Sequence, residues 1–204
     1  MKVAKILLGL VVSASMAASA GAQTVVWNNG TPDDINGYAI TPPWTEADNF
    51  SFGSSTSFNT IRFWLLQFDT APTAGFSWFI YNSGAGAPGS VISSGFAAAV
   101  QTAQGTGAAG TNRYQIDMTI GSQSLAAGSY WLGLNDQVST DARYWATSSA
   151  SGDAMYNGGN LWESGGVELA YELRDVNAVP EPASMVLVAT GLLGVFGVAR
   201  RRKQ

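Results

Sequence analysis

Residues 183–199, near the C-terminus, contain no charged side chain and are mostly apolar or small. A helix needs about 17 to 25 such residues to cross a bilayer, so we expect a transmembrane helix here. Four cations follow this run directly: Arg200, Arg201, Arg202 and Lys203. Cations at this position stay cytoplasmic and act as a membrane stop. The chain before the helix is therefore predicted to lie on the far side of the membrane from the cytoplasm.

The N-terminus indicates export independently. Lys2 and Lys5 precede an apolar core at residues 6–12, and small residues follow. This order is typical of a secretory signal peptide, and the core is too short to span a membrane as a helix. The small residues at 18–20 or 20–22 supply a cleavage site, so the mature chain is expected to begin at Gly21 or Gln23. We assign residues 1–22 to the signal peptide.

Residues 23–178 are predicted to fold as one exported domain, since domains usually contain about 50 to 250 residues. This segment has four arginines, no lysine and 13 acidic residues, which gives a net charge of −9. Binding to nucleic acid depends on clustered Lys and Arg side chains, so we expect no nucleic-acid partner. The chain contains no cysteine, and its core must therefore hold without disulfides.

Short apolar and aromatic runs alternate with clusters of Gly, Ser, Asn, Pro and Thr throughout this domain. The pattern is typical of β-strands joined by turns. The predicted strands are residues 58–68, 76–81, 91–100, 114–120, 129–135, 143–147 and 167–173, with shorter ones at 25–27 and 50–52. Residues 71–73, 82–89, 104–112 and 148–159 are predicted loops. Strands of this number and spacing indicate an all-β fold of two packed antiparallel sheets.

The C-terminal residues 179–204 resemble the PEP-CTERM sorting signal of Gram-negative, exopolysaccharide-producing bacteria. Its Pro-Glu-Pro motif is matched by Pro180, Glu181 and Pro182, and the apolar helix and Arg-rich end follow in the family's order. The resemblance implies recognition and cleavage near the motif by a membrane protease called exosortase. The protein would then be anchored in the inner membrane before processing and reach the cell surface or the extracellular space afterwards. An ordinary C-terminal anchor behind a chance Pro-Glu-Pro is the alternative interpretation.

Two further segments, residues 81–91 and 125–134, resemble the β-sandwich domains often found ahead of PEP-CTERM tails. This second resemblance implies a jelly-roll-like fold, and it implies no activity. Residues 81–91 are predicted to form a hairpin around a Gly- and Pro-containing turn. In the other segment, alternation of side chains predicts two faces: Tyr130, Leu132 and Leu134 on one, and Trp131, Gly133 and Asn135 on the other.

Several kinds of catalysis are excluded by residue types that are missing. Without histidine or cysteine, the chain has no Ser-His-Asp or Cys-His site and no zinc site built on imidazole or thiolate. We therefore assign no catalytic residue. Glycoside hydrolysis by carboxyl groups alone is not excluded by the missing residue types, because it needs just two acids that face each other across a sugar. The available acids are Asp33, Asp34, Glu46, Asp48, Asp136, Asp141, Glu163 and Glu168, and the sequence does not select a pair among them.

A segment rich in oxygen ligands contains Asp33, Asp34 and Asn36. Calcium takes six to eight oxygen ligands, so these residues are the candidate calcium ligands. Asp and Asn are equally typical of ordinary turns, and the spacing is not that of an EF-hand. Apart from this calcium candidate, we expect no cofactor.

The chain has seven tryptophans, whose rings combine a large apolar face with a polar edge. Such rings stack on the apolar faces of sugars. Trp44 and Trp162 lie in or near predicted loops and are the candidate sugar-binding residues, whereas Trp64, Trp78 and Trp131 lie in apolar strands and are expected in the core. Two hypotheses follow: a non-catalytic surface or matrix protein that binds exopolysaccharide, or a carboxylate-dependent glycoside hydrolase that acts on it.

Overall fold

The structure, a computed structural model, describes residues 23–137, 141–149, 151–159 and 161–176. The signal peptide, the Pro-Glu-Pro motif, the predicted transmembrane helix and the basic end all lie outside these residues. A compact unit extends from Thr24 to Val176, within the segment predicted as the exported domain. In this described part of the chain, no helix has the length and apolarity that crossing a bilayer requires.

The described residues form thirteen strands and one short 3₁₀ turn, η2 (Ala108–Gly110). The strands are β1 (Thr24–Asn28), β2 (Gly37–Ala39), β3 (Thr45–Phe52), β4 (Thr56–Gln67), β5 (Gly75–Gly84), β6 (Ala87–Thr106), β7 (Asn112–Leu125), β8 (Gly128–Asn135), β9 (Arg143–Ser149), β10 (Met155–Asn157), β11 (Glu163–Ser164), β12 (Glu168–Leu169) and β13 (Tyr171–Asp175).

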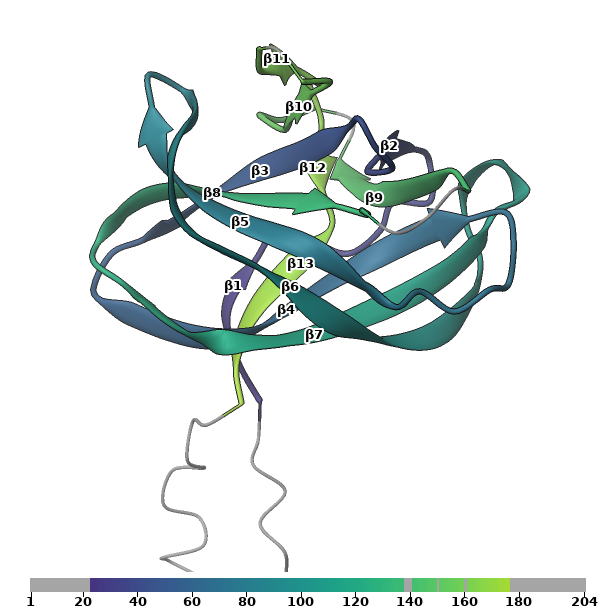
Figure 1. Cartoon of the computed structure of the whole chain (residues 1–204), viewed down its shortest axis with the longest axis horizontal. Helices are drawn as coiled ribbons and strands as arrows, with labels where there is room; N and C mark the ends of the chain where they lie inside the picture. Colours follow the sequence, from purple (N-terminus) through teal and green to yellow (C-terminus); the bar gives the residue numbers. More distant parts are fainter. Residues whose placement is uncertain (1–22, 138–140, 150, 160, 177–204) are drawn as a thin grey trace, which may run out of the picture. The chain divides into compact units, whose positions relative to one another are not determined.

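Strands β2 to β9 pair as one long hairpin folded on itself. Antiparallel pairs join β2 with β9, β3 with β8, β4 with β7, and β5 with β6. Further pairs join β9 with β4 and β8 with β5, which gives the sheets β2-β9-β4-β7 and β3-β8-β5-β6. This connectivity is that of an eight-stranded jelly roll. The predicted all-β, jelly-roll-like sandwich is therefore confirmed, and Figure 1 shows β3, β8 and β5 in a layer above β4 and β7.

Strand β6 links the two sheets along one side. Its residues 87–98 pair with β5, whereas residues 99–106 pair with β7 in the other sheet. The predicted β5–β6 hairpin is confirmed, but most of residues 82–89 and part of 104–112 are strand instead of loop. The turn contains only Ala85 and Gly86, with φ angles of 53° and 84°. Positive φ at both central residues is what a tight two-residue hairpin requires.

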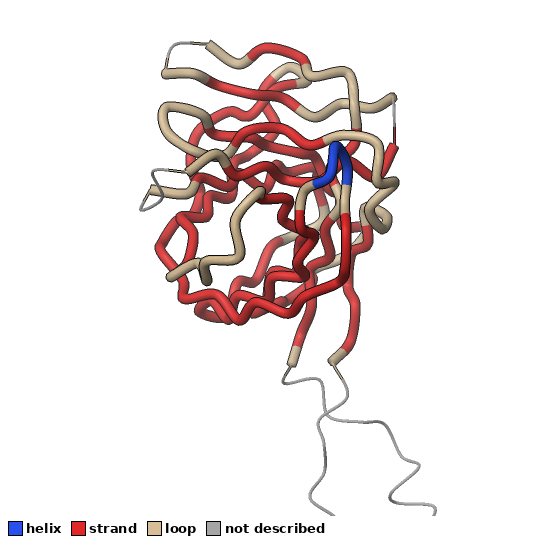
Figure 2. The backbone as a smooth tube through the Cα atoms, turned by 90° about the vertical axis from the view of Figure 1, so that its right-hand side faces the viewer, coloured by secondary structure: helices blue, strands red, loops and turns tan. Residues whose placement is uncertain are grey.

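Additional strands extend both sheets. Strand β13 pairs with residues 60–63 of β4, beside the stretch of β4 that pairs with β9, and β1 pairs with β13. Thr24 lies opposite Asp175, so the two ends of the compact unit lie side by side (Figure 2). On the other sheet, β10 pairs with β3 and β11 pairs with β10. The sequence did not predict β2, β10 or β11, and the predicted strand at 167–173 is divided at Ala170 into β12 and β13.

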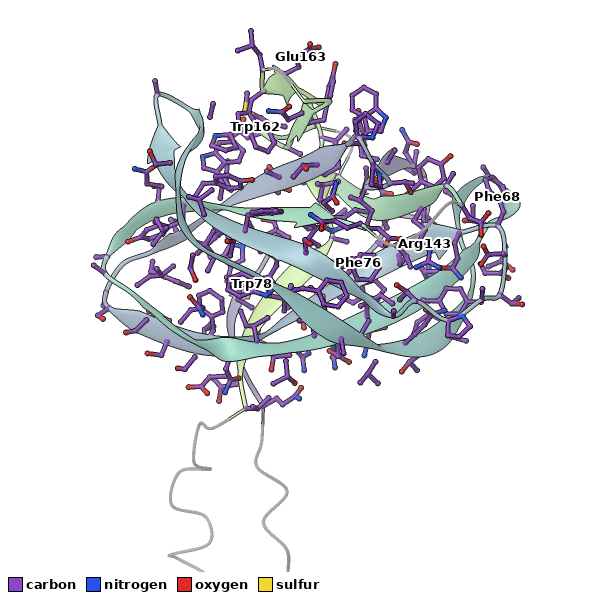
Figure 3. All side chains as sticks on the ribbon, in the orientation of Figure 1. Phe68, Phe76, Trp78, Arg143, Trp162 and Glu163 are labelled. Atoms are coloured by element: carbon purple, nitrogen blue, oxygen red, sulfur yellow. The ribbon has the colours of Figure 1, made fainter. Side chains whose placement is uncertain are left out.

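Large side chains fill the space between the two sheets. Phe63 contacts Phe76 and Trp145 edge to face, with ring centroids 5.0 and 5.9 Å apart. All three residues are fully buried, and Figure 3 shows Phe76 and Trp78 between the layers. The alternation predicted for β8 is confirmed, since Leu132 and Leu134 lie in this core and Trp131 lies in a separate cluster. Trp64, Trp78 and Trp131 are all buried, as predicted. Trp78 lies in this core, whereas Trp64 and Trp131 lie in two smaller clusters.

Each of the domain's four arginines pairs with a carboxylate. Arg62 forms two hydrogen bonds, of 2.6 and 2.9 Å, with Asp117 on the neighbouring strand β7. The other pairs are Arg113 with Asp34, Arg143 with Asp136, and Arg174 with Glu172. The positive charge of the exported domain therefore lies within internal ion pairs, which leaves its excess of acidic groups to dominate the surface field.

Candidate functional site

A cavity of about 380 Å³ lies between β2, from one sheet, and β3 and β10, from the other. These strands lie near one another in the upper part of Figure 1. The lining residues are Tyr38, Ala39, Trp44, Glu46, Tyr156, Ser164 and Gly165. Three aromatic rings and one carboxyl group therefore surround the same space.

Strand pairing places the polar and aromatic lining residues. Tyr156 on β10 lies directly opposite Glu46 on β3. Tyr38 on β2 lies opposite Trp145 on β9, and its Oη donates a 2.9 Å hydrogen bond to the carbonyl oxygen of Gly165. This bond ties β2 to the segment after β11, so the wall of the cavity joins parts of the chain that are 127 residues apart.

Trp44 supplies the most exposed ring of the cavity wall, with 39% of its surface accessible. Its ring contacts Tyr156 edge to face, with centroids 5.9 Å apart. Gly158 also lies against the indole, where an added Cβ would sit 2.8 Å from Cζ3 of Trp44. The ring is thus held in place while it remains available to a ligand, and the sequence-based candidate Trp44 lies in the wall of this cavity.

Glu46 is the acidic residue of the cavity wall, and only 3% of its surface is exposed. Among the residues that the structure describes, its carboxyl group has no hydrogen-bond or ion-pair partner. Burial raises the pKa of Glu46 from 4.5 to about 8, because a low-dielectric surrounding disfavours the charged form. The raised pKa favours the protonated form of this carboxyl group, which can both donate and accept a hydrogen bond.

Trp162, the other candidate tryptophan, lies in a different cluster. It contacts Tyr81 edge to face, with centroids 5.5 Å apart, and packs with Ala47 and Trp131. Ala47 neighbours Glu46 on β3, and successive side chains of a strand point to opposite faces. The structure therefore does not bring Trp44 and Trp162 together. Glu163, next in sequence, accepts a 2.7 Å hydrogen bond from Oη of Tyr156. Figure 3 labels Trp162 and Glu163 near the β10–β11 hairpin.

Two of the eight candidate acids, Asp48 and Glu168, meet at one amide nitrogen. Nδ2 of Asn29 donates to Oδ2 of Asp48 at 2.9 Å and to Oε2 of Glu168 at 2.8 Å. Asp48 is fully buried and also accepts hydrogen bonds from the backbone N–H groups of Asn49 and Leu169. Burial raises the pKa of Asp48 to about 8, and the charge of Glu168 adds to this rise. The contacts join β3 to β12 and to the end of β1.

The calcium candidates have separate protein partners. Asp33 accepts a 2.7 Å hydrogen bond from Oγ1 of Thr147, and Asp34 pairs with Arg113. Oδ1 of Asn36 accepts a hydrogen bond from the next backbone N–H. In the described part of the chain, no three acidic side chains are grouped in a way that could hold a metal ion.

Sequence reasoning named Glu46 only as one of eight available acids, and it did not name Tyr38 or Tyr156. A stronger signal for Glu46 was present, because Glu46 and Asp48 continue the period-two pattern of Phe50 and Phe52 along one face of β3. That pattern puts both carboxyl groups on the inner face of the sandwich. No comparable signal marked Tyr156, which lies in a segment predicted as loop.

Comparison with known families finds one match. Residues 178–203 match the PEP-CTERM protein-sorting motif, which confirms the prediction made from Pro180, Glu181 and Pro182. The motif marks an exported protein that is anchored in a membrane before it is processed, and it implies a membrane protease of the exosortase type as a partner. Comparison with curated proteins finds no match to the chain.

Proposed function

We propose that this chain is a non-catalytic surface or extracellular-matrix protein whose β-sandwich binds exopolysaccharide through the cavity beside Trp44. The exposed Trp44 ring, held against Tyr156 and next to the buried Glu46, is the observation that carries this proposal. In this account, export and exosortase processing deliver the domain to the cell surface or the extracellular space, where the polysaccharide lies.

The chemistry of a sugar fits these groups. A pyranose presents an apolar face of C–H groups to an aromatic ring and hydroxyl groups to hydrogen-bonding partners. A cavity of about 380 Å³ falls within the range of roughly 300 to 1,000 Å³ for small-molecule sites. Trp44 supplies the ring, while the Glu46 carboxyl and Oγ of Ser164 supply polar contacts. The cavity would hold a short segment of a glycan chain.

The non-catalytic assignment has two supports. Histidine and cysteine are absent from the whole chain, and Asp48, which shares the Asn29 amide with Glu168, is fully buried and bonded to backbone groups. A carboxylate-dependent glycoside hydrolase is the second candidate function. In such a hydrolase Glu46 would act as the general acid, because its raised pKa suits that role. The reaction also requires a second carboxyl group about 5 to 9.5 Å away across the sugar.

A retention assay tests the proposal. The exported domain, residues 23–178, would be passed over immobilised exopolysaccharides and screened on a glycan array. We expect Trp44→Ala to weaken retention at least about tenfold, which corresponds to roughly 1.4 kcal/mol. Leu161→Ala removes another exposed apolar side chain and should leave retention unchanged. Failure of the unmodified domain to bind any saccharide would refute sugar binding.

The same protein separates binding from hydrolysis. Glu46→Gln keeps the size of the side chain and its hydrogen-bonding capacity but cannot transfer a proton. If the domain releases reducing sugar from a bound polysaccharide and Glu46→Gln abolishes that release while retention persists, the hydrolase is the correct assignment. Bound polysaccharide that stays intact with both variants supports the non-catalytic role.

A further inference from the structure

The carboxyl group of Glu46 is an unusual component of a ligand cavity. It is 97% buried, lines the cavity, and has no protein partner among the described residues. A buried carboxyl group without a partner is costly, and proteins generally place an opposite charge or hydrogen bonds against it. The free side of this group is the cavity itself, so a ligand is the partner that the geometry leaves open.

The residues that share the cavity with Glu46 are apolar, aromatic or, in Ser164, hydroxyl-bearing, and the charged groups nearby are acidic. Tyr38 faces the cavity from β2 and Tyr156 from β10, and Tyr156 donates its hydroxyl hydrogen bond to Glu163. Leu134 lies opposite Glu46 on β8, and Asp48 follows two residues later on the same face of β3. No Lys or Arg is among the residues that line the cavity. The surroundings therefore favour a positive charge and oppose an anionic ligand such as a uronate.

Three aromatic rings share the cavity with this carboxyl group. The faces of tyrosine and tryptophan rings attract cations within about 6 Å of the ring centre, and aromatic cages of this kind bind ammonium groups. Here Trp44 and Tyr156 are in edge-to-face contact, and Tyr38 is fixed by its hydrogen bond to Gly165. A cage of three rings closed by one carboxyl group matches the chemistry of an ammonium ion.

We propose that the cavity selects a saccharide carrying a protonated amine, with the ammonium group held among Tyr38, Trp44 and Tyr156 and paired with Glu46. This inference rests on the proposed function and names its ligand class, an amino sugar. Such a unit offers a pyranose face to Trp44 and a positive charge to Glu46 at the same time. Trp44 then contributes affinity for saccharides in general, and Glu46 contributes the preference for the amine.

Binding would be coupled to a proton. In the free protein Glu46 is protonated below about pH 8, whereas an ammonium ligand stabilises the carboxylate. Each binding event below that pH therefore releases one proton from Glu46. By linkage, the affinity for a permanently charged cation should rise up to about tenfold per pH unit as the pH approaches 8, and then level off.

Two oligosaccharides of equal length test the selectivity: one of glucosamine and one of N-acetylglucosamine, which lacks the charge. Titration calorimetry on the exported domain at about pH 6, where such amines are largely protonated, should give at least tenfold tighter binding of the glucosamine oligomer. Glu46→Gln should remove this preference. Asp153→Asn makes the same acid-to-amide replacement at a residue that does not line the cavity and should retain it.

Choline tests the proton coupling, because its quaternary ammonium group keeps its charge at every pH. We expect its dissociation constant to fall between about pH 6 and 8 for the unmodified domain and to stay constant for Glu46→Gln. Circular dichroism would show that Glu46→Gln and Asp153→Asn are both folded. A flat pH profile for choline binding to the unmodified domain would overturn the proton coupling, because it would show that Glu46 is ionised before the ligand binds.

The outcomes for the two oligosaccharides are distinguishable. If neither oligomer binds, the proposed sugar-binding function falls together with this inference. If the N-acetylated oligomer binds as tightly as the glucosamine oligomer, or if the amine preference survives Glu46→Gln, the inference is wrong and sugar binding stands.

Discussion

Glu46 on β3 and Tyr156 on β10 lie directly opposite each other in the sheet, and both line one cavity. Strand β10 is not part of the eight-stranded jelly roll but is added at the edge of β3. The candidate site is thus formed where extra strands extend the sandwich, while the jelly roll holds β2 and β3 in place. This arrangement separates residues that stabilise the fold from residues available to a ligand.

Stability should decrease as the pH rises, because two buried acids have raised pKa values. Burial in the folded state raises the pKa of Glu46 from 4.5 to about 8 and the pKa of Asp48 from 3.8 to about 8. Between about pH 4 and 8, the folded state therefore binds more protons than the unfolded chain. The free energy of unfolding should therefore fall through this window, with each group contributing a slope of at most about 1.4 kcal/mol per pH unit, and level off above pH 8.

Urea denaturation of the exported domain at several pH values measures this effect. Glu46→Gln mimics the neutral acid, so it should match the unmodified domain near pH 4 and be more stable at pH 9. If the free energy of unfolding of Glu46→Gln differed from that of the unmodified domain by the same amount at every pH from 4 to 9, the raised pKa of Glu46 would be contradicted.

Gly158→Ala should weaken saccharide binding without unfolding the domain. The added methyl group would lie 2.8 Å from Cζ3 of Trp44, a distance that forces the indole to move. Because Trp44 is partly exposed, its displacement should cost little stability, while affinity for saccharide should drop several-fold. Gly53→Ala is the matched control, since nothing lies within 4 Å of its Cβ position. Equal affinity of the two variants would show that the position of the Trp44 ring is unimportant.

Trp145→Phe should destabilise the sandwich. Trp145 is fully buried, contacts Phe63 and Tyr171, and donates a 2.8 Å hydrogen bond from Nε1 to the carbonyl oxygen of Ala170. The smaller ring leaves a void and an unpaired carbonyl, so we expect a loss of about 2 to 4 kcal/mol. Chemical denaturation measures the change. Val25→Ala, at a half-exposed position, should cost far less, and equal losses would argue against the assigned core.

Changing Pro180, Glu181 and Pro182 to alanine should block processing of the full-length protein in an exosortase-containing host. The match to the sorting motif covers residues 178–203, so the altered chain should accumulate uncut in the inner-membrane fraction. Immunoblots of membrane and extracellular fractions measure the outcome. A control chain with alanine at Leu161 should be processed normally. Release of the altered chain at the normal rate would contradict a role for the motif.

Side-chain alternation predicted the centre of the fold well. In β8 the apolar residues Leu132 and Leu134 recur with period two, so both the strand and its buried face could be inferred. The full extent of strand β6 was harder to predict from the sequence. Its ends contain Gly, Ser, Ala and Thr, and its conformation depends on pairing with β5 and β7. The same holds for β10, whose three residues form a strand only because the edge of β3 is available.

The candidate site was predicted in part. Trp44 was identified because it follows Pro42 and Pro43 in a loop, and that position leaves its ring exposed. Trp162 is also near a predicted loop, but Tyr81 and Trp131 form a cluster on the outer face of the sheet and its ring packs there. The role of Glu46 depends on sharing a cavity with Tyr156, which is far from it in sequence, and with Tyr38, whose strand belongs to the other sheet. Such contacts follow from tertiary structure and leave no local pattern.

The central claim is that a saccharide binds at Trp44. Two-dimensional ¹H–¹⁵N spectra of the exported domain resolve the indole N–H signals of its tryptophans, and titration with the glucosamine oligomer tests the claim residue by residue. We predict that the Trp44 signal shifts in a saturable way, while those of the buried Trp145 and the clustered Trp162 do not. Saturable shifts centred on Trp162, or no shift of Trp44 at saturating saccharide, would contradict it.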